Sequence, residues 1–358
     1  MLALILALIK DSAPPDALIP DTVMPLRFHA IRGPLLALLA FALFSGHDAV
    51  VKTLGGSYAA IQIVFFSVLL GLPLAMLMLM RDRTDGTLLP RYPGWTALRT
   101  AASVMTGVSV FYAFSVLPLT QVYAILFAAP LLITVLAIPV LGERVGLHRG
   151  GAVLVGLIGV LIVLRPGAGG EGMSLGHAAA LLGAVGSALA SIIVRRIGAE
   201  ERNVVLLLYP MMANLTIMGV ALPFVYRPMP LADFASVAAI AGLAFVASLC
   251  VIAAYKASEA ALIAPMQYSQ ILWAALLGWL FFNELPDGAT VVGAGVIIVS
   301  GLYILMREGR RDVSANRPVS QTRLRPDTGT VPRASALEQI GSEDAREHPG
   351  TQEGSSHR

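Results

Sequence analysis

One stretch of the chain occurs twice, and it constrains the fold more than any other feature. The two copies run from Ala113 to Glu143 and from Ala254 to Glu284, and they align without a gap. Each copy begins at the end of one apolar segment, passes a short polar turn and closes a long apolar run on a single Glu. Apolar runs of about 20 residues can cross the hydrocarbon core of a bilayer as helices. The repeat therefore predicts a membrane protein built from two copies of one unit.

The composition agrees with a membrane protein and argues against several other classes. Hydrophobic residues make up 56% of the 358 residues and charged residues 13%, whereas soluble domains carry about 25% charged residues. The single cysteine, Cys250, cannot form an intramolecular disulfide, and no Cys or His spacing is typical of a metal site. No glycine-rich phosphate loop follows a strand pattern. We therefore expect no metal, no cofactor and no catalytic centre.

The apolar segments predict an all-α polytopic protein with ten transmembrane helices. The predicted spans are 33–52, 58–80, 95–116, 121–141, 149–165, 174–194, 203–224, 235–257, 262–282 and 288–306. The domain plan is a cytoplasmic N-terminal segment (1–32), a first repeat (33–165), a linker (166–173), a second repeat (174–306) and a disordered cytoplasmic tail (307–358). Residues 1–23 are either native or an over-extended start, because Met24 is a second candidate initiator.

Lys and Arg concentrate at the span ends that would face the cytoplasm if the N-terminus lies inside. Cytoplasmic loops carry an excess of these residues, so the bias places both termini in the cytoplasm. Five spans per copy is an odd number, so the second copy must insert upside down relative to the first. Such inverted repeats are a recurrent architecture of secondary transporters, whose substrate site lies at the repeat interface. The basic pI near 9.1 therefore reflects membrane orientation, and we expect no binding to nucleic acid.

Motifs at the end of each repeat resemble a known family. The first copy has LGERVG at 141–146 and GGAVLVGLIGVLIVLRPG at 150–167, and the second has FFNELPDGATVVGAGVIIVSGLYIL at 281–305. These segments look like the EamA-type repeat of the drug/metabolite transporter superfamily. Within it, FSGHDAVVKTLGGSY (44–58), IQIVFFSVLLGLPL (61–74) and the stretch 111–143 are closest in look to bacterial riboflavin importers. The resemblance implies a ten-helix carrier of the bacterial inner membrane, without a catalytic cofactor, whose cavity is lined mainly by helices three, four, eight and nine.

Ionisable residues inside predicted spans are functional candidates, because each is costly in the bilayer unless it is paired or hydrated. Asp48 and Lys52 lie one helical turn apart on the first helix, so they face the same way and can pair. We expect them to couple or gate transport. The alternative is that Lys52 extends to the outer interface and Asp48 neutralises it.

Two pairs of residues, with one member in each copy, are expected to have structural roles. Glu143 and Glu284 close the two long apolar runs, where each could cap the next helix or pair with a basic residue. Pro130 and Pro265 interrupt helices four and nine, because proline removes a backbone hydrogen bond. Either a fixed bend or a kink at a moving gate is compatible with the sequence.

Aromatic and amide side chains inside the spans are the candidate substrate ligands. A flat heteroaromatic substrate needs ring faces for stacking and amide or hydroxyl partners for its edges. The candidates are Gln267, Tyr268, Gln270 and Trp273 on helix nine, with Tyr112, Tyr123 and Tyr255 near other span ends. The alternative for the tyrosines is the interfacial aromatic belt.

These features favour a secondary transporter, with riboflavin uptake as the leading function. Carriage of S-adenosylmethionine and export of amino acids or drugs are the alternatives. An intramembrane enzyme is less compatible, because acid and base residues are not clustered. The expected partners are a small-molecule substrate and the lipid bilayer, and a monomer and a homodimer both fit the sequence.

Overall fold

The computed structural model describes residues 26–79, 88–143, 145–165, 174–198, 200–258 and 260–308, and their regular structure is helical. The first half contains α2 (Leu26–Gly55), α3 (Ala60–Leu79), α4 (Pro93–Val116), α5 (Leu119–Leu126), α6 (Ala129–Leu141) and α7 (Leu147–Leu164). The second half contains α8 (Leu175–Ile197), α9 (Asn203–Ala221), η1 (Leu222–Phe224), α10 (Leu231–Ala257), α11 (Ala260–Ile263), η2 (Ala264–Ser269), α12 (Gln270–Phe282) and α13 (Gly288–Glu308). The expectations for 1–23, the linker and the tail beyond 308 lie outside the described residues.

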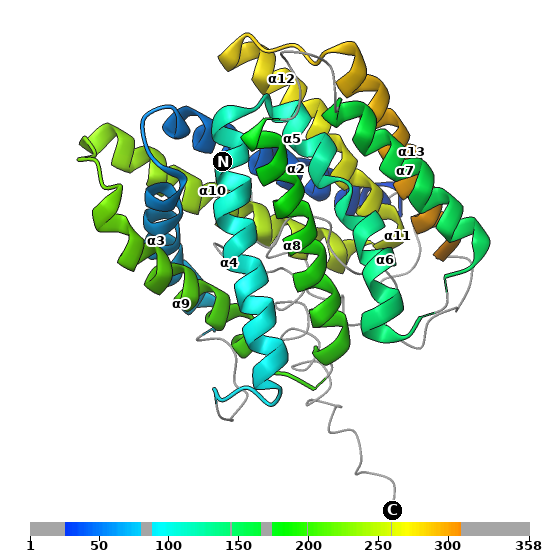
Figure 1. Ribbon diagram of the computed structural model, residues 1–358, viewed down its shortest axis with the longest axis horizontal. Coiled ribbons are helices and arrows are strands. Elements are labelled where there is room, and N and C mark those ends of the chain that lie inside the picture. Colours follow the sequence, from blue (N-terminus) through cyan, green and yellow to red (C-terminus); the bar gives the residue numbers. More distant parts are fainter. Residues whose placement is uncertain are drawn as a thin grey trace, which may run out of the picture.

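The two halves pack through corresponding helices. The first helix of each half packs on the third helix of the other, α2 on α10 and α8 on α4. The second helices, α3 and α9, pack on one another at one side of the bundle, and the fifth helices, α7 and α13, at the opposite side (Figure 1). Every one of these contacts between the halves therefore has a counterpart when the halves are exchanged.

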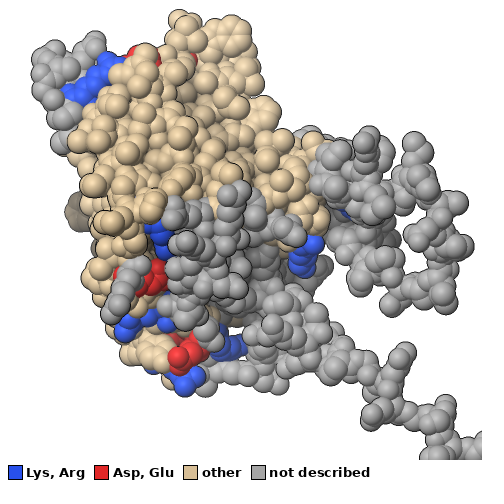
Figure 2. Space-filling model, turned by 90° about the vertical axis from the view of Figure 1, so that its right-hand side faces the viewer, with Lys and Arg blue, Asp and Glu red and all other residues tan. Residues whose placement is uncertain are grey.

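The outer surface of the bundle is apolar over a broad area. Eight described helices are long and apolar enough to cross a membrane. Large apolar side chains face outward along them, for example Leu154 (65% exposed) and Val299 (69% exposed). Figure 2 shows one face on which a wide area free of charged side chains lies between charged groups at its two ends. Large contiguous apolar surface needs lipid or a partner to cover it, so the chain is a multi-pass membrane protein.

Eight of the ten predicted spans correspond to these eight helices, and the other two, 58–80 and 262–282, are exceptions. One exception is α3, which runs from Ala60 to Leu79 and of which Ala60–Met76 is the apolar segment with described side chains. The predicted span 262–282 is divided among α11, η2 and α12, so its first part does not run as one α-helix. The division of the second has a local cause, since η2 contains Pro265 in its first turn.

The fourth segment of each half is broken near its middle. In the first half α5 ends at Leu126 and α6 restarts at Ala129, with Pro130 in the first turn of α6. In the second half the 3₁₀ segment η2 occupies Ala264–Ser269 before α12 begins. Pro265 and Pro130 therefore start new helical segments, where a proline costs no hydrogen bond. The breaks fall at corresponding places in the repeated stretch.

Candidate functional site

The two broken segments meet in the interior of the bundle. The rings of Phe127 and Tyr268 pack edge to face, with centroids 5.1 Å apart and an interplanar angle of 76°. Phe127 and Tyr268 occupy the same position in the two copies of the repeated stretch. Broken helices at a repeat interface are a common way to build a transporter site, because they free backbone groups and admit polar side chains. The candidate site is therefore centred on the contact between Phe127 and Tyr268.

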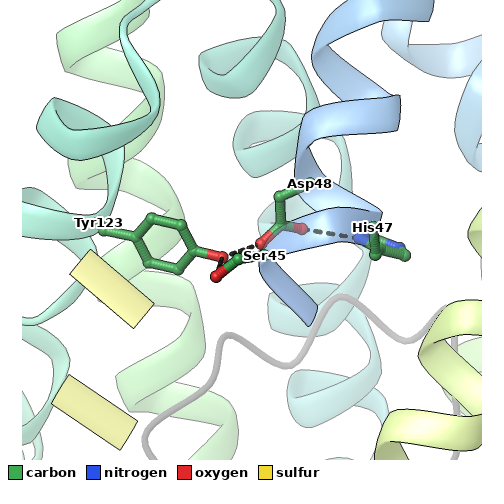
Figure 3. A network of polar contacts seen from close by, with 4 residues as sticks. All are labelled: Ser45, His47, Asp48 and Tyr123. Carbon is green, nitrogen blue, oxygen red and sulfur yellow. Dashed lines mark hydrogen bonds and ion pairs between the residues drawn. The ribbon is translucent and has the colours of Figure 1, made fainter. Parts of the chain in front are cut away.

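Asp48 lies next to this centre and is buried in a polar network (Figure 3). Its side chain comes from α2, and the residue is 3% exposed. Tyr123 of α5 donates its hydroxyl hydrogen to Asp48 Oδ2. His47 Nδ1 lies 2.7 Å from Asp48 Oδ1, and Ser45 Oγ lies 3.4 Å from the Tyr123 hydroxyl oxygen. The carboxyl group therefore joins the first helix to the broken fourth segment.

His47 and Asp48 are adjacent in the sequence and so start from different faces of α2, yet the structure brings the two side chains together. The imidazole is 3% exposed as a residue and also packs edge to face on Phe111 of α4, with centroids 5.9 Å apart. A buried carboxylate is costly unless it is hydrogen-bonded and balanced by a positive charge. His47 can supply such a charge by taking up a proton. The network can therefore exist in two protonation states.

Lys52 forms its ion pair with the other half of the molecule. Its Nζ lies 2.8 Å from Glu284 Oε1 and donates to the backbone oxygen of Leu117 at 2.6 Å. The ammonium also lies 5.2 Å from the centroid of the Phe282 ring, within cation–π range. The Lys52 side chain is 9% exposed. Asp48 and Lys52 both lie on α2, as predicted, but they belong to two separate polar groups.

Glu143 and Glu284 are placed by the same helix ending. The residue before each Glu is left-handed, Gly142 with a φ of 70° and Asn283 with a φ of 53°, conformations that Gly and Asn tolerate best. The backbone N–H of Glu143 then donates to Ala137 and that of Glu284 to Gly278, which satisfies free carbonyls at both helix ends. The Gly-Glu and Asn-Glu dipeptides therefore stop the helices and orient the two carboxylates.

Glu143 pairs across the halves, as Glu284 does. Arg195 Nη2 of α8 lies 2.8 Å from Glu143 Oε1, and the arginine side chain is 4% exposed. Arg195 lies near the end of the first helix of the second half, as Lys52 lies near the end of the first helix of the first half. Arg195 was not among the site residues predicted from the sequence. Alignment of those two helix ends would have indicated it as the counterpart of Lys52.

The second broken segment carries polar atoms that have no hydrogen-bond partner within the described part of the chain. They include the Tyr268 hydroxyl, Ser269 Oγ, Gln270 Nε2 and Trp273 Nε1. Gln270 is 1% exposed and Gln267 is 4% exposed. A Cβ placed on Gly301 of α13 would lie 2.1 Å from the Tyr268 hydroxyl oxygen, so Tyr268 points at that helix. Gln270 and Trp273 thus remain the donors best placed to serve a ligand.

The other predicted aromatic residues separate by burial. Tyr123 is 3% exposed and belongs to the central network, although the interfacial belt was an alternative for it. Tyr112 and Tyr255 are half-buried on α4 and α10. Trp279 is 56% exposed on α12, as expected for a side chain facing lipid. Of the predicted tyrosines, Tyr123 and Tyr268 are therefore the two that reach the centre.

Outside the spans, charged loop residues tie the halves together. Burial favours the neutral form of Asp287, but hydrogen bonds from Thr290 and the nearby Arg165 guanidinium outweigh it and hold the pKa of Asp287 below its usual value. This contribution to stability is present at neutral pH and is lost as the pH falls through the lowered pKa. The hydrogen bond from Tyr92 to Glu200 raises the pKa of Tyr92.

A separate pocket of about 310 Å³ lies at one end of the bundle. Its lining is Tyr92, Trp95, Leu141, Arg196, Ile197 and Glu200. The guanidinium carbon of Arg196 lies 4.9 Å from the Trp95 ring centroid. This pocket was not predicted from the sequence, because its residues come from three helix ends that lie far apart in the chain.

A multi-pass bundle with a broken helix in each half and a polar centre defines a membrane transport protein. A model of the EamA-like transporter family matches residues 31–165 and 174–306. The chain therefore belongs to the EamA-like transporter family of the drug/metabolite transporter superfamily, as its closing motifs predicted.

Relatives of known name differ in what they carry. The chain is 29% identical over 280 residues to the pseudopaline exporter CntI of Pseudomonas aeruginosa, covering 77% of this chain and 96% of that protein. It is 25% identical to the S-adenosylmethionine uptake transporter of Rickettsia bellii, covering 76% and 92%. It is 30% identical to the riboflavin transporter of Rhizobium johnstonii, covering 62% and 73%. A solved crystal structure shares the fold with a TM-score of 0.52 at 18% identity, covering 78% of this chain and 99% of that chain.

Proposed function

We propose that this chain is a secondary transporter that moves a small polar metabolite by alternating access between two inverted five-helix repeats. The observation that carries the proposal is the meeting of two broken segments, one from each half, beside a buried carboxyl group. The exchange of corresponding helix contacts between the halves supports the inverted arrangement. We further propose an inner-membrane location with both termini in the cytoplasm, which the distribution of Lys and Arg supports.

We propose riboflavin uptake as the leading function. Two riboflavin transporters are among the relatives, at 30% and 25% identity. A flat ring system with acceptor atoms along its edge would use the aromatic faces and unpaired donors of Gln270 and Trp273. In this proposal Gln267, Tyr123, Tyr112 and Tyr255 complete the substrate environment, and Tyr268 packs the meeting point. No chemical step on the substrate is proposed.

S-adenosylmethionine is the second candidate, because one observation favours a cation. The carboxyl group of Asp48 accepts from Tyr123 and contacts His47, whose imidazole packs on the Phe111 ring, and carboxylates and ring faces both attract positively charged ligands. Relatives named for S-adenosylmethionine uptake cover 76% of this chain. In either case Asp48 is the residue proposed to couple a proton to transport, with Lys52 placed at a gate.

The test is uptake of labelled riboflavin by riboflavin-auxotrophic bacteria that express the chain. We expect saturable uptake that unlabelled riboflavin competes, and no such uptake with an empty vector. Saturable S-adenosylmethionine uptake in place of riboflavin uptake would select the second candidate. If a well-expressed protein imports neither, uptake of each compound into inside-out vesicles, whose outer face is the cytoplasmic face, decides between an exporter and rejection of both substrates. Trp279→Ala, on the exposed face of α12, is the matched control variant.

A further inference from the structure

We propose that the ion pairs Lys52–Glu284 and Arg195–Glu143 are the two gates of the transporter, one at each end of its central site. The inference rests on the proposed carrier function and extends it to the residues that open and close each side. Each pair joins the two halves, with N–O distances of 2.8 Å in both cases. In each pair the base ends the first helix of one half, and the acid follows the broken helix of the other half.

The two pairs lie at opposite ends of the bundle, as their contacts with α4 establish. Lys52 donates to the backbone oxygen of Leu117, just after the last residue of α4. The residue after Arg195, Arg196, stacks on Trp95 in the first turn of α4. The 24 residues of α4 give it a length of about 36 Å, which exceeds the thickness of the hydrocarbon core. The pairs are therefore separated by roughly the membrane thickness.

Burial distinguishes these two pairs from the other described pairs of a Lys or Arg with a carboxylate. The side chains are 9% and 27% exposed for Lys52 and Glu284, and 4% and 13% for Arg195 and Glu143. In the loop pair Arg91–Glu200 the side chains are 67% and 53% exposed, and exposed pairs contribute at most about 1 kcal/mol. Arg165 and Asp287 are intermediate, at 34% and 39%. Among the described pairs of a Lys or Arg with a carboxylate, these two therefore have the most buried charges.

A buried ion pair suits a gate because its two states are close in free energy. The mutual attraction of the charges is offset in large part by their loss of hydration, so opening into a water-filled passage has a modest cost. An apolar seal would lose much more on hydration. Charge pairs also specify one closed arrangement, since each base meets one acid.

The structure with both pairs formed shields the centre from both ends. Asp48 and Tyr123 are each 3% exposed, and Gln270 is 1% exposed. Separation of Lys52 from Glu284 would open the centre to one side of the membrane, and separation of Arg195 from Glu143 to the other. With the proposed orientation, the lysine pair is the outer gate and the arginine pair is the inner gate.

A reporter cysteine at the centre tests the gates without any knowledge of the substrate. Ser45 is 1% exposed and lies in the Asp48 network, and Cys250 is the one native cysteine. In a Cys250→Ala, Ser45→Cys background, labelling by a membrane-impermeant maleimide is measured in right-side-out and inside-out vesicles. Lys52→Glu should raise labelling from outside about tenfold or more, and Arg195→Glu should do so from inside. The swaps Lys52→Glu/Glu284→Lys and Arg195→Glu/Glu143→Arg should restore slow labelling.

Two further variants keep the test decisive. Arg91→Glu breaks an exposed pair and should leave labelling from both sides unchanged. Lys52→Gln removes the charge without placing two acids together, and it should move the sidedness in the same direction if the charge reversal fails to fold. Equal changes on both sides, or no change in folded variants, would overturn the gate assignment.

Transport is measured separately, so failure of the carrier proposal is distinguishable from failure of the gates. Two double variants are made in the Cys250→Ala background, Lys52→Cys/Glu284→Cys and Glu143→Cys/Arg195→Cys. A bifunctional methanethiosulfonate reagent joins the two thiols of each. We expect each cross-link to stop substrate movement and a reductant to restore it. Sided labelling without any transport would keep the gates and reject the proposed substrates. Full transport by cross-linked protein would overturn the gates alone.

Discussion

The fourth segments of the two halves have the same shape and different chemistry. In the first half, Tyr123 is committed to Asp48, and α6 continues directly after the break. In the second half a longer 3₁₀ stretch precedes α12, and Gln270 Nε2 and Trp273 Nε1 have no partner within the described residues. The difference suggests a division of labour, in which the first half fixes the charge and the second half offers hydrogen-bond donors.

Unpaired buried donors have a measurable cost, which is why they point to a ligand. A buried polar group left without a partner costs about 1–3 kcal/mol. Two such donors lie within one turn of α12, whereas in the first-half segment Tyr123 donates to Asp48 and the atom of Gln121 without a described partner is an acceptor, Oε1. The comparison therefore predicts that mutations in the two segments have different effects.

Asp48→Asn should have the largest effect. The substitution keeps the size of the side chain and removes its charge, so the first-half segment loses the group that we propose to couple transport to protons. We expect the transport rate to fall by about tenfold or more and the remaining rate to lose its dependence on external pH. The measurement is initial uptake by cells over a range of external pH.

Asp287→Asn is the matched control for Asp48→Asn, because it removes a carboxylate at the membrane edge. It should leave the pH profile of transport unchanged. If Asp48→Asn retains the wild-type pH profile, the coupling role is wrong and the first half contributes structure alone.

Trp273→Ala should have an intermediate effect, seen in substrate affinity. Loss of a ring face and an N–H donor should raise the apparent KM about tenfold, with membrane expression close to wild type. Trp279→Ala on the same helix, 56% exposed, should change neither quantity. The measurement is the concentration dependence of uptake together with quantitative blotting of membranes. Parallel losses of expression and uptake in Trp273→Ala would assign it to packing.

The smallest effect on transport should come from Tyr268, the residue that matches Phe127 in the first half. Tyr268→Phe makes the two positions chemically alike and should leave substrate affinity within about twofold, because the hydroxyl faces α13. Gly301→Ala should lower stability by about 1–3 kcal/mol, since its Cβ would collide with that hydroxyl.

The double variant Tyr268→Phe/Gly301→Ala tests this contact. It should recover most of the stability lost by Gly301→Ala, as measured by thermal unfolding in detergent. Strictly additive effects would show that the two residues do not meet, and a large loss of affinity in Tyr268→Phe would move Tyr268 into the substrate site.

Much of the fold follows from the sequence, because membrane helices are specified by local hydropathy. The apolar spans, the repeat of the unit and the helix-ending dipeptides at Gly142 and Asn283 can all be found in the sequence alone. The 3₁₀ form of η2 is different, because Pro265 indicates an interruption but not the helix type that follows it.

The site was less predictable, because its pairings join residues far apart in the chain. Spacing placed Asp48 and Lys52 on one face, but the partner of Lys52 is Glu284, and that choice depends on how the two halves pack. The hydrogen bond between His47 and Asp48 depends on side-chain rotation rather than on helical spacing. Arg195 was missed because it ends a span, where basic residues are common in any membrane protein.

A structure of the protein with its transported substrate bound tests the proposed site most directly. We expect the substrate to lie where the broken segments meet, in contact with Tyr123 or Asp48 from the first half and with Gln270 or Trp273 from the second. A substrate bound through one half alone, or in the end pocket between Trp95 and Arg196, would overturn this site.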